Sequence, residues 1–183
     1  MEDHVRHVFP CGTPALDFVG TLQERRATVP IERIGSPGLL DSWLVEAGLL
    51  DERPASDHTD LRAALELREA IYLLVRARLI GSPLPAGAVT AVNRRAAGVP
   101  VAICLGPGGT SRSGTAAQAL ADLAREAVEI IAGRDAALLR ECGRPDCTQV
   151  YLDRSRGGRR EWCAMWTCGN RVKAAALRAR RRQ

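Results

Sequence analysis

The sequence predicts a mainly α-helical protein with a minor β element, built as a helical domain over residues 1–139 and a small treble-clef-like zinc finger over residues 140–183. Three observations support this fold class. Apolar residues recur at helical spacing through most of the first 139 residues. A short run rich in branched residues near residue 100 breaks that spacing. Four of the six cysteines then fall within a strongly basic C-terminal segment.

The helical domain is predicted from capping residues and apolar spacing. A first helix is expected over residues 13–27, and a second over 36–48, where Ser36 can cap free N–H groups and a proline follows in the first turn. The strongest amphipathic pattern spans residues 59–80, and Gly81 and Pro83 end it. Shorter helices are predicted over 86–97 and 115–132.

The segment between the helices predicted over 86–97 and 115–132 has a different composition. Residues 99–105 are rich in branched side chains and predict a strand, and the glycine-rich residues 106–114 predict a hairpin turn or a loop. That loop lacks the lysine and hydroxyl ending of a phosphate-binding loop. His4, His7 and His58 are scattered, and no nucleophile or paired-carboxylate pattern is visible, so we expect no enzyme.

The cysteine cluster predicts a metal site. Cys142, Cys147, Cys163 and Cys168 have the spacing C-x4-C-x15-C-x4-C, which presents two close thiol pairs. Zinc takes four ligands in a tetrahedron, and four thiolates close its coordination sphere, so we expect one structural Zn²⁺ per chain and no catalytic zinc. Chance core cysteines or a redox pair are the alternative interpretations.

The chain around the cysteines predicts a zinc knuckle, which is the turn between Cys142 and Cys147, followed by a β-hairpin and a helix. Residues 148–153 are expected to form a strand, 154–158 a turn and 159–162 the returning strand. The residues after Cys168 predict a helix whose inner face would carry small apolar side chains. These are Val172, Ala175, Ala176 and Ala179.

The charge distribution predicts a polyanionic partner. Residues 140–183 carry 12 basic and four acidic residues, whereas the whole chain has a net charge of only +5. A basic surface on a small zinc-bound module attracts nucleic-acid phosphates. Arg171 could instead neutralise the thiolates, and Trp162 and Trp166 could pack over the knuckle. The candidate DNA contacts are Arg171, Lys173, Arg178, Arg159 and Arg160.

The C-terminal segment resembles the CGNR zinc finger, which takes its name from the run Cys168-Gly169-Asn170-Arg171. Further matches are Asp153, Ser155, Arg160, Trp162, Met165 and Lys173. Such fingers follow an N-terminal ABATE-type domain, whose hallmark is similar to LDFVNT. Residues 16–21 read LDFVGT, so Gly20 replaces the asparagine. The resemblance implies a bacterial, stress-related transcription regulator that binds DNA through its finger.

Together these patterns predict a cytoplasmic DNA-binding regulator. No apolar run is long enough to span a membrane, and no leader segment is recognisable at the N-terminus. A homodimer through the N-terminal helices is expected because a single finger covers little surface. No small-molecule effector can be named. The alternative function is a zinc-stabilised module that binds a protein or RNA without specific DNA binding.

Overall fold

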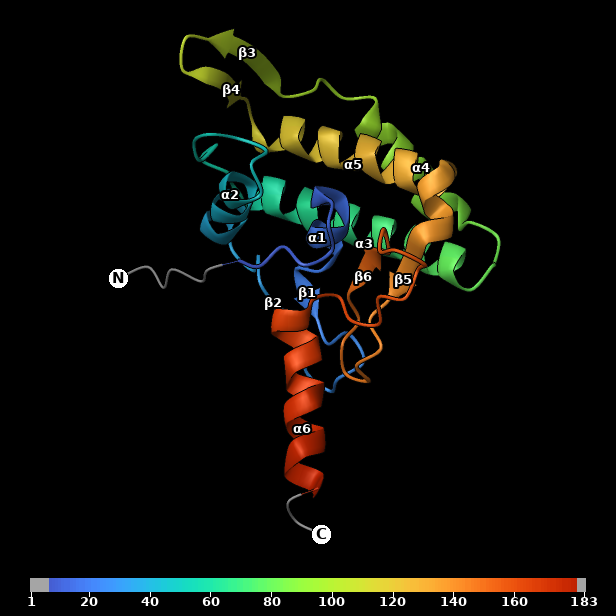
Figure 1. Cartoon of the computed structure of the whole chain (residues 1–183). Helices are drawn as coiled ribbons and strands as arrows, with labels where there is room; N and C mark the ends of the chain where they lie inside the picture. The colour runs from blue at the N-terminus through green and yellow to red at the C-terminus, as the bar shows by residue number, and fades with distance from the viewer. Residues whose placement is uncertain (1–6, 181–183) are drawn as a thin grey trace.

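The structure is a computed structural model that describes residues 7–180, so His4 and the last three residues of the basic segment lie outside the described residues (Figure 1). It confirms the predicted fold class, a mainly helical chain with small antiparallel strand pairs. The α-helices are α1 (Pro14–Val19), α2 (Pro37–Glu46), α3 (His58–Leu79), α4 (Ala86–Ala96), α5 (Ala116–Ala132) and α6 (Asn170–Arg180). The strand pairs are β1 (Leu22–Gln23) with β2 (Ile31–Glu32), β3 (Ala102–Gly106) with β4 (Gly109–Ser113), and β5 (Leu139–Glu141) with β6 (Val150–Leu152).

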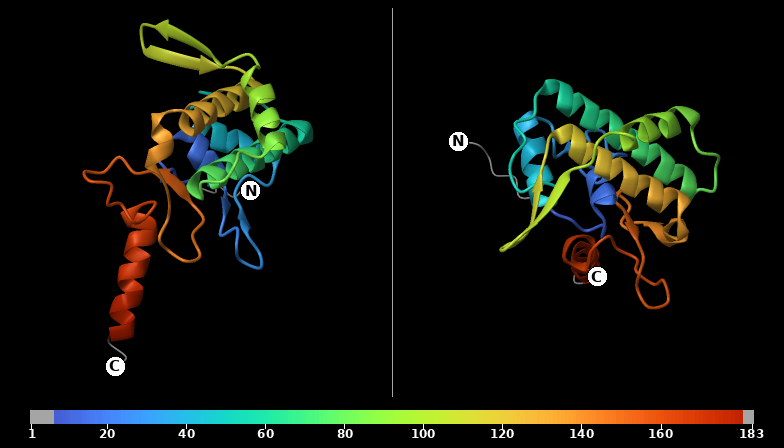
Figure 2. Two further views of the ribbon diagram at one scale, coloured as in Figure 1. Left: turned by 90° about the vertical axis from the view of Figure 1, so that its right-hand side faces the viewer. Right: turned by 90° about the horizontal axis from the view of Figure 1, so that it is seen from above.

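The helical body is organised around α3 and α5, which pack against each other and are both contacted by α1 and α4 (Figure 2). Large side chains from α1 and α2 complete the core, where the rings of Phe18 and Trp43 lie 5.3 Å apart, centroid to centroid. Ile71 of α3 and Leu123 of α5 are fully buried. The apolar spacing therefore predicted the two long helices correctly, within one residue at each end.

The helix starts follow from local capping chemistry. The Ser36 side chain accepts from the Leu39 amide, as predicted for the start of α2. Asp57 forms a capping box at the start of α3, and Thr115 forms one with Gln118 at the start of α5. These side chains satisfy amide groups that have no partner inside the helix.

The first predicted helix is much shorter than expected. It ends at Val19, whereas the sequence pattern predicted helix to residue 27. The Thr21 hydroxyl donates to the Phe18 carbonyl at 2.7 Å, which gives the chain an alternative to continued helix. Glu24 adopts a positive φ of 51°, and the chain turns through β1 and β2.

The predicted hairpin inside the finger is wrong in its pairing. β6 forms where a strand was expected, but its partner is β5, which precedes the first cysteine, and residues 159–162 form no strand. The Asp153 carboxylate accepts from the Arg160 amide at 3.1 Å and from the Ser155 amide at 2.9 Å. These side-chain bonds hold the returning chain as a loop in place of a strand ladder.

No residue of the last helix is buried, and all but Val172 are exposed. The apolar strip of Val172, Ala175, Ala176 and Ala179 was predicted to pack inward, yet none of these residues is buried. Figures 1 and 2 show α6 projecting from the body, with its N-terminal end at the protein and its C-terminal end far from it. The prediction of an inner face on this helix is therefore wrong.

No helix among residues 7–180 combines the length and apolar character needed to cross a bilayer. The described helices pack into the body or, in the case of α6, extend from it as a charged rod.

Candidate metal centre and nucleic-acid interface

The four predicted ligands come together in the structure. The sulfur atoms of Cys142, Cys147, Cys163 and Cys168 all lie within 4.8 Å of one another, and all four residues are buried. The Cys147 and Cys163 sulfurs are 3.9 Å apart, and those of Cys163 and Cys168 are 3.5 Å apart. A zinc–sulfur bond of about 2.3 Å in a tetrahedron places sulfurs about 3.8 Å apart. The donor set and its spacing thus fit one structural Zn²⁺.

The first cysteine pair lies in the connection between β5 and β6. The Cys142 amide donates to the Gln149 carbonyl at 3.0 Å, which extends the strand pairing to the first ligand. The Cys147 amide donates to the Arg144 carbonyl at 2.9 Å and closes the turn between the two cysteines. The observed pair of β5 and β6 therefore encloses the first cysteine pair, whereas the predicted hairpin followed it.

The second cysteine pair is held by a loop and a helical turn. The Cys163 amide donates to the Cys142 sulfur at 3.4 Å, which links the two pairs directly. Cys168 lies in η2 (Met165–Gly169), a π-helical turn that leads into α6. A Cβ atom on Gly169 would lie 2.5 Å from the Met165 sulfur and 3.0 Å from the Trp162 ring. Glycine at this position therefore permits the ligand turn to pack closely.

Hydrogen bonds between the thiols of Cys142, Cys147 and Cys163 shift the pKa of each of them. Bonds from Cys147 and Cys163 lower the pKa of Cys142, and the bond to Cys142 raises the pKa of Cys147. Each thiol that donates is stabilised in its protonated form, so four sulfurs this close need a cation before all can be thiolates. Bound zinc supplies that charge and joins the two pairs.

Arg144, which no sequence pattern singled out, lies beside the metal ligands and contacts Cys168. Its guanidinium pairs with Glu24 of the β1–β2 segment at 2.9 Å. Although burial lowers the pKa of Arg144, its bonds to Glu24 and Cys168 raise it above its usual value. Charge compensation beside the thiolates had been considered for Arg171. The available signal was an arginine two residues after the first ligand, inside the knuckle itself.

The candidate DNA contact Arg160 is engaged within the protein. Its Nε donates to the Trp162 carbonyl at 2.9 Å, and its Nη2 donates to the carbonyls of Pro10 and Cys163. The guanidinium also stacks on the Tyr151 ring, 4.3 Å from the centroid. The structure thus places Arg160 in the fold of the ligand loop. Its neighbour Arg159 is exposed.

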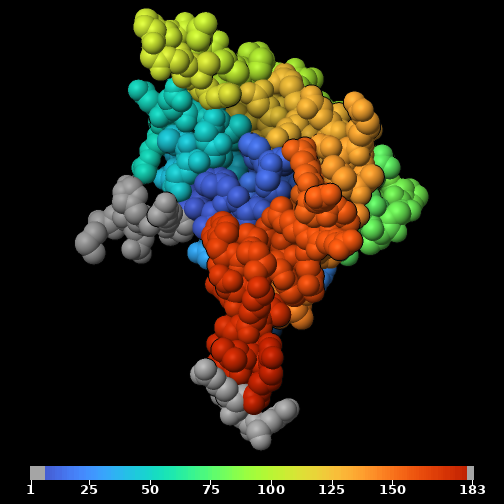
Figure 3. Space-filling view, viewed as in Figure 1, coloured from blue at the N-terminus to red at the C-terminus, as the bar shows by residue number. Residues whose placement is uncertain are grey.

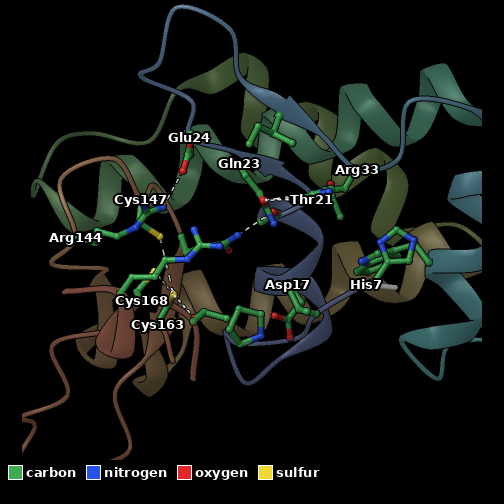
Figure 4. A pocket seen from close by; sticks show the side chains of 18 residues that line it. His7, Asp17, Thr21, Gln23, Glu24, Arg33, Arg144, Cys147, Cys163 and Cys168 are labelled. Atoms are coloured by element: carbon green, nitrogen blue, oxygen red, sulfur yellow. Dashed lines mark hydrogen bonds and ion pairs between the residues drawn. The ribbon is translucent and has the colours of Figure 1, made fainter. Parts of the chain in front are cut away.

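A cavity of about 280 Å³ separates the metal centre from the helical domain (Figure 4). Cys147, Cys163, Cys168 and Arg144 line one side, and Asp17, Thr21 and Arg33 lie across from them. Burial raises the pKa of Asp17 to about 7, although the Cys11 amide donates to its carboxylate at 2.8 Å. Zinc would fill little of this space, because the four sulfurs enclose it closely.

Gly20, which replaces the asparagine of the LDFVNT hallmark, lies against Gln149 beside this cavity. The Gln149 side-chain amide donates to the Gly20 carbonyl at 2.9 Å and accepts from the Cys11 thiol at 3.1 Å. A Cβ atom on Gly20 would lie only 2.0 Å from the Gln149 Oε1 atom. The Gln149 side chain thus occupies the space that a side chain at position 20 would fill.

The exposed helix α6 presents a strip of small apolar residues between two rows of cations. With about 100° of rotation per residue, Arg171 and Arg178 share one edge, while Lys173 and Arg180 share the opposite edge. The four residues of the apolar strip fall between the two edges. In the described part of the chain no acidic residue lies on α6, and none of these four cations forms an ion pair with another residue. Figure 3 shows the lower part of the helix projecting beyond the body.

The geometry defines a class of protein, a helical domain joined to a four-cysteine zinc finger with a basic helix. The model of the ABATE family, described as "Putative stress-induced transcription regulator", matches residues 12–134, and the CGNR zinc finger model matches residues 139–181. The chain therefore belongs to the ABATE family and carries a CGNR zinc finger. No curated protein matches the sequence.

Proposed function

We propose that the protein is a transcription regulator that binds duplex DNA by placing α6 in the major groove. The observation that carries this proposal is the exposed apolar strip of α6 with a row of cations on each side. The B-DNA major groove is about 12 Å wide and admits one α-helix between two phosphate backbones. A helix that is basic along both edges complements both walls of such a groove.

The structure suggests separate roles for the residues of α6. Arg171 and Arg178 would contact one phosphate backbone, and Lys173 and Arg180 the other. The alanines between them are small enough to let the helix approach base edges, and an alanine methyl can contact a thymine methyl. The zinc centre fixes the start of α6, so it sets the angle at which the helix meets the groove.

Salt dependence tests the phosphate contacts. Fluorescence anisotropy with a mixed-sequence duplex should show log affinity falling against log salt with a slope of about −3.6 for four contacts. Replacing Arg171 and Arg178 by Ala should bring the slope to about −1.8 while leaving one zinc per chain. No binding at low salt would remove DNA binding and favour the alternative, a module that binds protein or RNA.

A matched pair of charge variants tests the orientation of the helix. Ala175→Glu places a carboxylate within the apolar strip, whereas Ala174→Glu places the same charge on the opposite side of α6. Ala175→Glu should weaken DNA binding at least about tenfold more than Ala174→Glu. Equal losses from the two variants would contradict insertion of this face. Selection from a random DNA pool with the zinc-loaded protein would identify the sequence recognised.

We further propose a cytoplasmic homodimer, because bacterial DNA lies in that compartment and one finger module covers only about 600–1,000 Å². The predicted interface was the N-terminal helices. However, the apolar residues of α5, from Leu120 to Ile131, face the core of the same chain. That face of α5 is therefore not available for pairing, and a dimer would use other exposed surfaces of the helical domain.

A further inference from the structure

The hairpin of β3 and β4 stands away from the helical body (Figures 1 and 2). Every residue of β3 is exposed, with Ile103 at 56% and Leu105 at 87% of full accessibility. A two-stranded hairpin in water is marginally stable by itself, and this one has almost no packing against the rest of the chain. Two exposed apolar side chains on one face of such a hairpin indicate that it is completed by a partner.

The two edges of the hairpin are not equivalent. At the β4 edge, the Asp51 amide donates to the Arg112 carbonyl at 3.0 Å, and the Arg112 amide donates to the Asp51 side chain at 2.8 Å. The N–H and C=O groups of Arg112 therefore face away from β3. Ile103 is opposite Arg112, so its N–H and C=O groups face away from β4, toward the free edge of β3. Because this direction alternates along a strand, the N–H and C=O groups of Leu105, two residues on, face the same free edge. Within residues 7–180, that edge has no other strand beside it.

We propose that β3 pairs with β3 of a second copy of this chain, antiparallel and about a two-fold axis at Cys104. Cys104 is the central residue of the five-residue strand, so this register overlaps the two strands completely. Ile103 then lies opposite the partner's Leu105, and their outward backbone groups form two hydrogen-bonded pairs. The two Cys104 residues face each other as a non-hydrogen-bonded pair, with Cα atoms about 4.5 Å apart.

The composition of this edge favours a second copy over a charged partner. No charged residue occurs from residue 96 to residue 111. Exposed edge strands usually carry charges that prevent pairing, and this one carries none. A two-fold interface brings identical surfaces together, so an uncharged strand can meet itself without repulsion. The Ile103–Leu105 pairs supply apolar cross-strand contacts on one face of the joined sheet.

Cross-linking tests the register with the zinc-loaded full chain. Dibromobimane, a short thiol-bridging reagent, should link two wild-type chains through Cys104, and Cys104→Ser should abolish the product. In the double variant Cys104→Ser/Ser111→Cys the thiol lies on β4, directly opposite position 104. Two such thiols would be three strand spacings apart, about 14 Å, and should not be bridged. Equal bridging from both positions would overturn the proposed register.

Sedimentation velocity tests the interface without relying on a thiol. Leu105→Lys should raise the dimer dissociation constant at least about tenfold, equivalent to about 1.4 kcal/mol. Thr110→Lys adds the same charge on the neighbouring strand, away from the axis, and should leave the constant unchanged. A monomeric wild type, or a dimer insensitive to Leu105→Lys, would overturn the proposal. Neither result depends on DNA binding, so failure of that function is detected separately.

Discussion

Replacing Arg160 by Ala separates a structural role from a DNA contact. The guanidinium donates to the carbonyls of Pro10, Trp162 and Cys163 and stacks on Tyr151. Hydrogen bonds from a charged group contribute about 1.5–3 kcal/mol each when buried, and partial exposure of this side chain reduces that value. We expect Arg160→Ala to lower the free energy of unfolding by about 3 kcal/mol.

Urea unfolding of the zinc-loaded protein measures this loss. Arg160→Lys should recover little of it, because an ammonium group cannot reproduce a planar fork directed at several carbonyls. The matched control is Arg159→Ala, at an exposed neighbour, which should change stability by less than about 0.5 kcal/mol. If Arg160→Ala kept its stability and lost only DNA affinity, the structural assignment would be refuted.

Three further perturbations follow from the site. Cys163→Ser should abolish stoichiometric zinc, measured by elemental analysis, and expose the finger to proteolysis, because three ligands leave the site open. Asp17→Asn should remove a pH dependence. Burial raises the folded-state pKa of Asp17 from its ordinary value of 3.8 to about 7. The free energy of unfolding of the wild type should therefore fall by about 1.4 kcal/mol per pH unit between about pH 4 and pH 7 and level off above it, and urea titrations of the variant should lack this fall. Gly20→Ala should destabilise the wild type by about 1–2 kcal/mol but not a Gln149→Ala background, because the three atoms nearest to the added Cβ all belong to the Gln149 amide; equal losses in both backgrounds would contradict that contact.

Local chemistry in the sequence was sufficient to predict the helical body and the metal ligands. Helix starts at Ser36 and Thr115 depend on a capping side chain a few residues from the amide it binds. The cysteine spacing likewise predicts a metal site because four thiolates have few other uses in a reducing compartment. These signals act over short distances along the chain, so they can be read without knowing the fold.

Pairings that are chosen only in the folded chain could not be predicted in the same way. The partner of β6 is β5, and Arg144 meets Glu24, a residue 120 positions away. The sequence offers several arginines near the ligands, and only the folded chain selects which one reaches the thiolates. Arg160 was predicted to contact DNA because the sequence does not show whether a charged loop residue binds phosphate or backbone carbonyls.

The exposed apolar strip on α6 explains why an amphipathic pattern can point outward. An alanine side chain buries a single methyl group, and burial of one such group is worth about 0.8 kcal/mol. Three alanines and Val172 therefore give too little driving force to fold the helix back onto the body against the solvation of its cations. The helix is instead anchored at one end, where Cys168 joins it to the metal centre. A helix held in this way keeps both its small apolar strip and its flanking cations available, and that combination suits a nucleic-acid groove better than a protein core.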